Sequence, residues 1–391
     1  MTATMPGSQS SLREANQRRV IRAVRAAGSL TQAEIARATG LSAATVSNIV
    51  RELKEAGTLL VTPTSAGGRR AQSVSLSRRA GLALAVDFGH SHLRVAVGDM
   101  AHEVLAEETV PLDVDASAEE GLRVAQRLVE AVLRRAEVDR SEVVGVGLGV
   151  PGPIDTRTGT VGSSTILPGW VGVSPQDALA ERLGLPVHVD NDANLGALGE
   201  LVWGAGRGMT DLAYIKVATG VGAGLVIGGR IYRGSGGTAG EIGHITIDDT
   251  GKVCRCGNRG CLETFVGAPF LLELLRHSHG ELSLHQVITL AKEGDQGSRR
   301  VIADAGRHIG VGVANLCNLL NPQAVIVGGE LAQAGEILLG PIREAVDRYA
   351  IPSAARALTV TQGALGERAE MLGALALVLH ESELLPGDVV T

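Results

Sequence analysis

Three of the four cysteines fall within one eight-residue span, in the spacing Cys-x-Cys-x4-Cys, and a histidine lies ten residues before them. Three thiolates and one imidazole form a closed tetrahedral ligand set, the combination that suits a structural Zn²⁺ ion. Gly257 and Gly260 permit the tight loop that returns the third thiolate to the metal. A chance cluster of reduced cysteines is the alternative. The predicted zinc ligands are His244, Cys254, Cys256 and Cys261.

The chain of 391 residues is long enough for two or three domains with substantial cores. It contains no run of about 20 apolar residues that could span a membrane, and its first residues lack the apolar region of a secretory signal. Free clustered thiols are typical of a reducing compartment. We therefore expect a cytoplasmic protein with no membrane partner, in which Cys317 is a small buried core residue.

Charge is distributed unevenly along the chain. Residues 1–80 contain 12 Lys and Arg against 4 Asp and Glu, whereas the remaining residues contain 24 against 38. Only the N-terminal segment therefore has the balance that suits a polyanion such as DNA. A basic terminal segment can also be a solvated tail, so the pattern of residues within it must decide.

That pattern predicts a winged helix-turn-helix over residues 1–79. An amphipathic helix over residues 13–26 is followed by Thr31, which begins a second helix with a capping box completed by Glu34. Gly40 ends that helix, and Ser42 caps a third helix over residues 43–56. The short turn between the second and third helices is typical of the helix-turn-helix motif. Alternating apolar residues after Gly57 predict the two strands of a wing.

The third helix is expected to read DNA. If its apolar stripe is buried, short polar side chains near its start face outward, where they can approach base edges in a major groove. The predicted contacts on this helix are Ala44, Thr45, Ser47, Asn48 and Arg51. At the wing tip, Arg69 and Arg70 follow two glycines and are expected to reach a minor groove. A winged helix that binds protein, or a solvated turn, is the alternative.

The rest of the chain has the pattern of an α/β fold. Apolar strands are predicted at residues 82–86, 93–97, 143–150, 187–189, 212–217 and 324–327. Most of them end in a loop rich in glycine or carboxylate residues, the position at which α/β sheets bind ligands. Glycine-rich loops are weak evidence by themselves.

The order of several motifs resembles the ROK family of repressors, open reading frames and sugar kinases. They are Pro151-Gly-Pro-Ile-Asp155, Pro168-Gly-Trp170, Asn191-Asp192-Ala-Asn194, Gly240-Glu-Ile-Gly-His244, the cysteine cluster followed by Glu263, and Gly328-Gly329. The resemblance implies a two-lobed actin/hexokinase-like domain, which we place at residues 80–391 with the zinc motif at 244–263. An N-terminal winged helix is similar to the transcription-factor branch of the family.

The resemblance also implies a sugar site beside the zinc. The residues that would meet sugar hydroxyls are Asn191, Asp192, Glu241, His244 and Glu263. Zinc would orient His244, whose second ring nitrogen stays free to donate. In the family's kinases the residue that matches Asp192 is the general base of phosphoryl transfer from ATP. A surface or capping role is the alternative for each carboxylate.

Two departures from the kinase pattern favour a sensor. The family's kinases carry Asp-x-Gly-Gly-Thr at the first phosphate loop, whereas this chain has His90 and Ser91 at the last two positions. Ile166 replaces the Asn expected ahead of Pro-Gly-Trp. His90 and His92 could bind a metal or an anion, but a solvated or structural role is favoured.

The main hypothesis is a sugar-responsive transcriptional repressor. A homodimer or tetramer would bind a pseudo-palindromic operator in double-stranded DNA, and a sugar or sugar-phosphate effector would change the placement of the reading heads. The first alternative is an ATP-dependent sugar kinase with Asp192 as base and an appended DNA-binding domain. The second is a DNA-binding protein whose ROK domain serves only for dimerisation.

Overall fold

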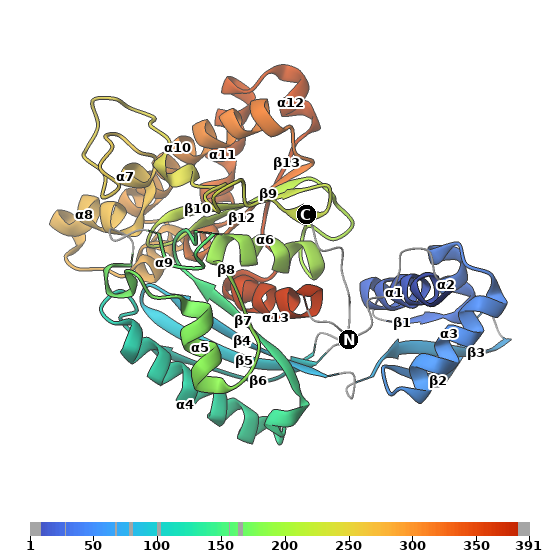
Figure 1. Cartoon of the computed structure of the whole chain (residues 1–391). Helices are drawn as coiled ribbons and strands as arrows, with labels where there is room; N and C mark the ends of the chain where they lie inside the picture. The colour runs from blue at the N-terminus through green and yellow to red at the C-terminus, as the bar shows by residue number, and fades with distance from the viewer. Residues whose placement is uncertain are drawn as a thin grey trace.

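The computed structural model describes residues 9–27, 29–66, 69–77, 81–99, 103–155, 157–162 and 167–381. These residues form one small sheet in the N-terminal part and two five-stranded sheets in the remainder (Figure 1). Within the described residues, no helix combines the length and the apolar composition that crossing a bilayer needs.

The N-terminal part is a three-helix unit with a β-hairpin. Its elements are α1 (Gln9–Ala27), β1 (Ser29–Thr31), α2 (Gln32–Thr39), α3 (Ala43–Glu55), β2 (Leu59–Ala66) and β3 (Arg69–Leu76). The strand order is β1-β3-β2, with β2 and β3 antiparallel. The Thr31 hydroxyl accepts from the Glu34 N–H while the Glu34 carboxylate accepts from the Thr31 N–H, so the predicted capping box is confirmed.

The third helix begins where the sequence predicted. The Ser42 hydroxyl accepts from the Thr45 N–H, and Gly40 ends α2 in the left-handed conformation at φ 67°. The buried stripe of α3 consists of Val46, Ile49, Val50 and Leu53, as expected. Glu52 accepts from Arg13 and Gln17 of α1, which fixes α3 against the first helix. The exposed face of α3 is therefore held in one orientation.

The first lobe of the large domain is built on a mixed sheet. Its strands are β4 (Leu82–Gly89), β5 (His92–Asp99), β6 (Val104–Pro111), β7 (Val143–Val150) and β8 (Val187–Asn191), in the order β6-β5-β4-β7-β8. β7 pairs with β4 and β8 in parallel, whereas β5 pairs antiparallel with both β4 and β6. Helices α4 (Ala118–Ala136) and α5 (Pro175–Leu183) cover the outer face (Figure 1).

The second lobe has a similar plan. Its strands are β9 (Leu212–Val217), β10 (Val221–Ile227), β11 (Arg230–Ile231), β12 (Ala324–Gly328) and β13 (Thr359–Gln362), in the order β11-β10-β9-β12-β13. Its helices are α7 (Glu263–Val266), α8 (Ala268–His279), α9 (Leu284–Glu293), α10 (Gln296–Leu320), α11 (Glu336–Tyr349) and α12 (Pro352–Ala357). Cys317 of α10 is buried, as predicted.

Two helices, α6 (Asp192–Val202) and α13 (Ala369–Glu381), lie between the two five-stranded sheets (Figure 1). Glycines make this close packing possible. A Cβ at Gly147 of β7 would lie 1.9 Å from the Ala374 carbonyl oxygen, and one at Gly373 would lie 1.8 Å from the Leu195 carbonyl oxygen. The predicted strands are all present, and the loops at the ends of β4, β7, β8 and β9 line one cleft.

Candidate functional site

The cysteine cluster forms a compact ligand set. His244 ends a short 3-10 helix (Ile242–His244), and the cysteines lie on the loop that leads into α7. One ligand atom from each of the four residues lies within 4.8 Å of every other. Gly257 and Gly260 adopt φ values of 94° and 64°, so the loop uses the left-handed conformations that glycine permits.

The spacing of the ligand atoms fits a tetrahedral ion. Zinc–sulfur and zinc–nitrogen bonds of about 2.0–2.3 Å give tetrahedron edges of about 3.3–3.8 Å. The Cys256 and Cys261 sulfurs are 3.7 Å apart, and the Cys254 sulfur is 3.6 Å from His244 Nδ1. Burial raises the pKa of Cys261 to about 12, so a bound dication would be needed to keep this thiol ionised at neutral pH. The four residues could hold a metal ion.

A cleft of about 380 Å³ lies beside this cluster, in the size range of small-molecule sites. The five residues expected to meet sugar hydroxyls all line it. They are Asn191, Asp192, Glu241, His244 and Glu263. His244 Nδ1 faces the sulfur of Cys254, while its Nε2 faces Glu241 at 3.9 Å. The imidazole thus joins the ligand set to the cleft wall.

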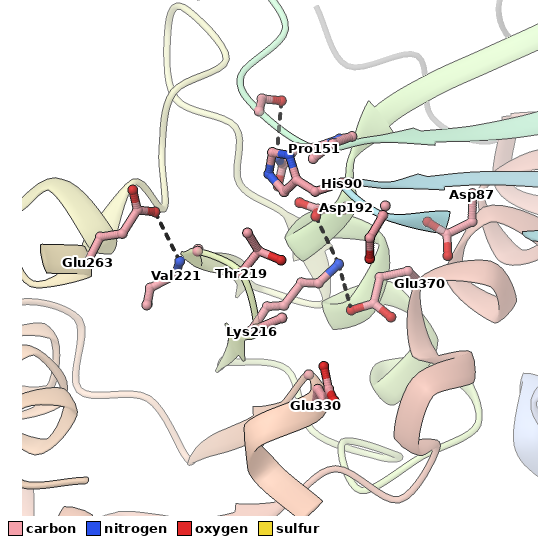
Figure 2. Close-up of a pocket in the computed structure, with 18 of the residues that line it drawn as sticks. Asp87, His90, Pro151, Asp192, Lys216, Thr219, Val221, Glu263, Glu330 and Glu370 are labelled. Carbon is pink, nitrogen blue, oxygen red and sulfur yellow. Dashed lines mark hydrogen bonds and ion pairs between the residues drawn. The ribbon is translucent and has the colours of Figure 1, made fainter. Parts of the chain in front are cut away.

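A lysine in the cleft was missed by sequence reasoning. Lys216 lies near the end of β9, and its ammonium group lies 2.9 Å from Asp192 Oδ2 and 3.4 Å from Glu370 Oε1 (Figure 2). Its side chain is 17 % exposed. Burial alone would lower the pKa of Lys216, but the neighbouring carboxylates, Asp192 foremost, outweigh burial and raise it. Lys216 therefore stays charged.

Asp87 completes this charged cluster. It lies near the end of the central strand β4 and is 2 % exposed. The charges of Lys216 and Asp192 both act on its carboxyl group. Its Oδ1 is buried and has no hydrogen-bond partner within the described residues. Burial raises the pKa of Asp87. This oxygen is a buried acceptor that no described residue uses.

On the opposite wall, Glu263 is held by two donors. Arg255 donates from Nε to Glu263 Oε1 at 2.8 Å. The Val221 N–H donates to Glu263 Oε2 at 3.2 Å (Figure 2). Arg255 lies between the first two cysteines, so the cysteine loop positions a carboxylate of the cleft. Burial, followed by repulsion from Asp192 and Glu263, raises the pKa of Glu241 to about 7.

Asn191 is the N-cap of α6. Its Oδ1 accepts from the N–H groups of Ala193 and Asn194, and its Nδ2 donates to the Gly152 carbonyl. Only one amide hydrogen of Asn191 is left for a ligand. The Ala193 N–H also donates to Asp192 Oδ1 at 2.8 Å. The helix therefore fixes both residues of the Asn-Asp pair.

The first-loop histidines have structural contacts. His90 Nδ1 lies 2.7 Å from Asp115 Oδ1, and its main-chain oxygen accepts from Val114. The ring of His92 lies against Gly89, where an added Cβ would be 2.2 Å from His92 Cε1. These contacts agree with the structural role that the sequence favoured. Ile166 lies outside the described residues.

The proposed reading residues gather on one face of α3. Ala44, Ser47, Asn48 and Arg51 are exposed, and Thr45 is half-buried. The Arg51 guanidinium donates to Asn48 Oδ1 at 3.0 Å. Arg69 and Arg70 begin β3 at the wing tip, but their side chains and the glycines at 67–68 lie outside the described residues.

Sequence reasoning missed Lys216, Glu370 and Arg255. A single lysine inside the apolar run of residues 212–217 was an available signal, because a charge within a buried strand needs a partner. The charge of Glu370 in an otherwise apolar helix gave the same signal. Neither pattern identifies the partner residue.

The architecture and the site together define a class: a winged-helix protein that carries a two-lobed α/β domain of the hexokinase-like type, with a carboxylate-lined cleft beside a Cys₃His set. The ROK family model matches residues 83–381, and a winged helix-turn-helix DNA-binding model matches residues 13–59. The chain belongs to the ROK family.

Relatives of two kinds are similar to this chain. The xylose repressor of Caldicellulosiruptor bescii is 31% identical over 97% of this chain and 99% of its own length. The glucokinase of Halalkalibacterium halodurans is 34% identical over 76% of this chain and 94% of its own. The crystal structure of a ROK family transcriptional regulator, described as a homologue of the Escherichia coli MLC protein, has a TM-score of 0.78 at 25% identity and covers 96% of this chain and 98% of its own.

Proposed function

We propose that this chain is a sugar-responsive DNA-binding repressor. The observation that carries the proposal is the extent of the matches: the repressor relative spans 97% of the chain, whereas the glucokinase relative spans 76%. The winged helix-turn-helix family model matches the N-terminal part, where basic residues are concentrated. The exposed polar face of α3 is the element that would enter a major groove.

The effector would bind in the cleft through its hydroxyl groups. Carboxylate oxygens accept hydrogen bonds from hydroxyl groups, and the free ring nitrogen of His244 donates a hydrogen bond to a hydroxyl oxygen. Asp192 stands at the start of α6, whereas Glu241 and Glu263 belong to the second lobe. The proposed contacts with the sugar are those of Asp192, Glu241, His244 and Glu263, with the remaining amide hydrogen of Asn191. A sugar held by both sides would draw the lobes together.

We propose that the Cys₃His set holds a structural zinc ion. The ion would fix the loop that carries Arg255 and would orient His244 toward the cleft. It would supply rigidity and would not take part in a chemical step.

The proposed switch changes the relative placement of two reading heads. A homodimer or a tetramer would present two α3 helices to successive major grooves of a pseudo-palindromic operator. Lobe closure is a hinge movement that would alter their spacing. The effector must bind the DNA-free arrangement more tightly than the DNA-bound one, because a ligand without such a preference shifts nothing.

The contacts of the first loop argue against a kinase. The His92 ring covers the turn at Gly89, which corresponds to the first phosphate loop of the kinases. We therefore propose that phosphoryl transfer from ATP is absent. An ADP-release assay with neutral sugars should give no turnover above that of Asp192→Asn, and turnover that this variant abolishes would establish the kinase alternative.

The test of the main proposal uses the full-length, zinc-loaded protein. A duplex selected from a random library by this protein serves as operator, and fluorescence anisotropy measures its affinity with and without each sugar of a panel. We expect one sugar to weaken operator binding by about 5- to 150-fold, the usual range of allosteric coupling. Sequence-specific DNA binding that no sugar alters would instead support a ROK domain that serves only for dimerisation.

A further inference from the structure

The cleft has an excess of negative charge. Seven of its lining residues carry a carboxyl group, and three carry a permanent positive charge. The three cations are Arg94, Lys216 and Arg255. An anionic ligand gains affinity only where a cation or a free backbone donor meets it. The partners of these three cations therefore decide whether the cleft can hold a phosphate group.

Each of the three cations already has an acidic partner. Lys216 contacts Asp192 and Glu370 at 2.9 and 3.4 Å, and Arg255 donates to Glu263 at 2.8 Å. Arg94 lies 3.9 Å from the Glu367 carboxylate and donates to the main-chain oxygen of the same residue. At Lys216 and Arg255, a phosphate group would have to displace a mostly buried carboxylate from its partner, which leaves that carboxylate unpaired. At Arg94 it would have to replace the Glu367 carboxylate, which is 55% exposed.

Several backbone donors at the cleft are engaged as well. The N-terminus of α6 is capped by the side chains of Asn191 and Asp192. In the glycine loop after β9, the Val221 N–H donates to Glu263 and the Ala218 N–H donates to the Gly220 carbonyl. The helix end and these parts of the loop therefore offer few free N–H groups to an anion.

The Cys₃His set does not supply positive charge. Three thiolates and a neutral imidazole around a dication carry a net charge of −1, so an occupied site would add to the negative potential of the cleft. Glu330 and Glu367 contribute two further carboxyl groups to the lining.

We infer that the cleft takes an uncharged, unphosphorylated sugar and rejects sugar phosphates and nucleotides. This inference rests on the proposed function, because it names the class of effector for the same site. Asp192, Glu241 and Glu263 serve as acceptors for sugar hydroxyls, whereas Glu330 and Glu367 line the cleft without an assigned contact to the sugar. Lys216 is the internal counter-ion of Asp192 and Glu370, a positioning residue rather than a donor to the ligand.

The test compares neutral sugars with their phosphates on the full-length, zinc-loaded protein. Isothermal titration uses D-xylose, D-glucose and N-acetylglucosamine beside xylose 5-phosphate, glucose 6-phosphate and N-acetylglucosamine 6-phosphate, and AMPPNP with Mg²⁺. We expect one neutral sugar to bind at least tenfold more tightly than its own phosphate, and no saturable binding of AMPPNP. A phosphate that binds more tightly than its parent, or a panel in which no neutral sugar binds, would overturn the inference.

A charge variant tests the physical reason. Glu330→Gln combined with Glu367→Gln removes two negative charges from the cleft wall, and Glu336→Gln, on the exposed start of α11, is the matched control. At low salt, the double variant should bind the phosphate of the tightest-binding neutral sugar several-fold more tightly than the unaltered protein does. Its affinity for the neutral sugar itself should change less than twofold. An unchanged phosphate affinity would refute the electrostatic argument.

Operator binding, measured in parallel, separates the two proposals. If a sugar phosphate releases the DNA, the repressor function stands and the inference about the effector fails. If the protein binds no DNA duplex but binds a neutral sugar, the inference stands and the repressor function fails.

Discussion

Replacement of Lys216 by methionine should destabilise the large domain strongly. The change keeps an unbranched side chain but removes the ammonium group between Asp192 and Glu370, whose side chains are 14 % and 6 % exposed. Removal of one partner from a buried ion pair costs about 3–5 kcal/mol, because the remaining charge has lost both water and its counter-ion. With about 2.1 cal/mol/K of unfolding entropy per residue over residues 83–381, that loss lowers the melting temperature by about 5–8 °C.

The defect should also depend on pH. Without the ammonium group, the stranded carboxyls hold protons in the folded variant at pH values where they are ionised in the unfolded chain. The folded state then binds more protons than the unfolded state, so stability falls as pH rises. The free energy of unfolding of the variant should therefore fall further below that of the unaltered protein at pH 8 than at pH 6. The added loss is up to about 1.4 kcal/mol per pH unit for each carboxyl.

Differential scanning calorimetry of the zinc-loaded protein at both pH values measures this effect. Lys292→Met, on the exposed surface of α9, is the control and should melt as the unaltered protein does. The double variant Lys216→Met/Asp192→Asn removes one stranded carboxylate and should regain about 1 kcal/mol or more. If Lys216→Met melts within 1 °C of the unaltered protein at both pH values, the reasoning about this charged cluster is wrong.

Three further predictions concern the other parts of the molecule. Cys256→Ser should lower the metal content from about one zinc per chain to a small fraction, and it should weaken sugar binding. The control Cys317→Ser, outside the ligand set, should retain the metal. Mass spectrometry of the purified proteins measures the metal content. Asn48→Ala and Arg51→Ala should each weaken specific operator binding by about 1–3 kcal/mol in anisotropy titrations, while sugar affinity stays constant. Glu55→Ala, at the far end of α3, is the control. Equal operator affinity in all three variants would exclude α3 as the reading helix. Gly147→Ala should lower the free energy of unfolding, measured with denaturant, by about 3 kcal/mol or more, because its Cβ would overlap the Ala374 carbonyl. The control Gly340→Ala, in α11 with open space around it, should be neutral or stabilising. Equal stabilities of the two variants would contradict the close packing of α13 on β7.

The sequence alone determined the features that depend on short spacings. The Cys₃His set, the capping box of Thr31 and the buried stripe of α3 each involve residues close together along the chain, so local geometry fixes which side chains can meet. The order of the motifs was sufficient to identify the family and hence the two-lobed fold.

Only the tertiary structure decided which charges meet in the cleft. Lys216 is 24 residues from Asp192, and Glu370 belongs to the last helix, so their contact depends on α6 and α13 lying together between the sheets. Sequence spacing carries no information about such pairs, because any lysine in a buried strand needs a partner but several carboxylates could serve. The fold selects among them by bringing the ends of β4, β8 and β9 to one cleft.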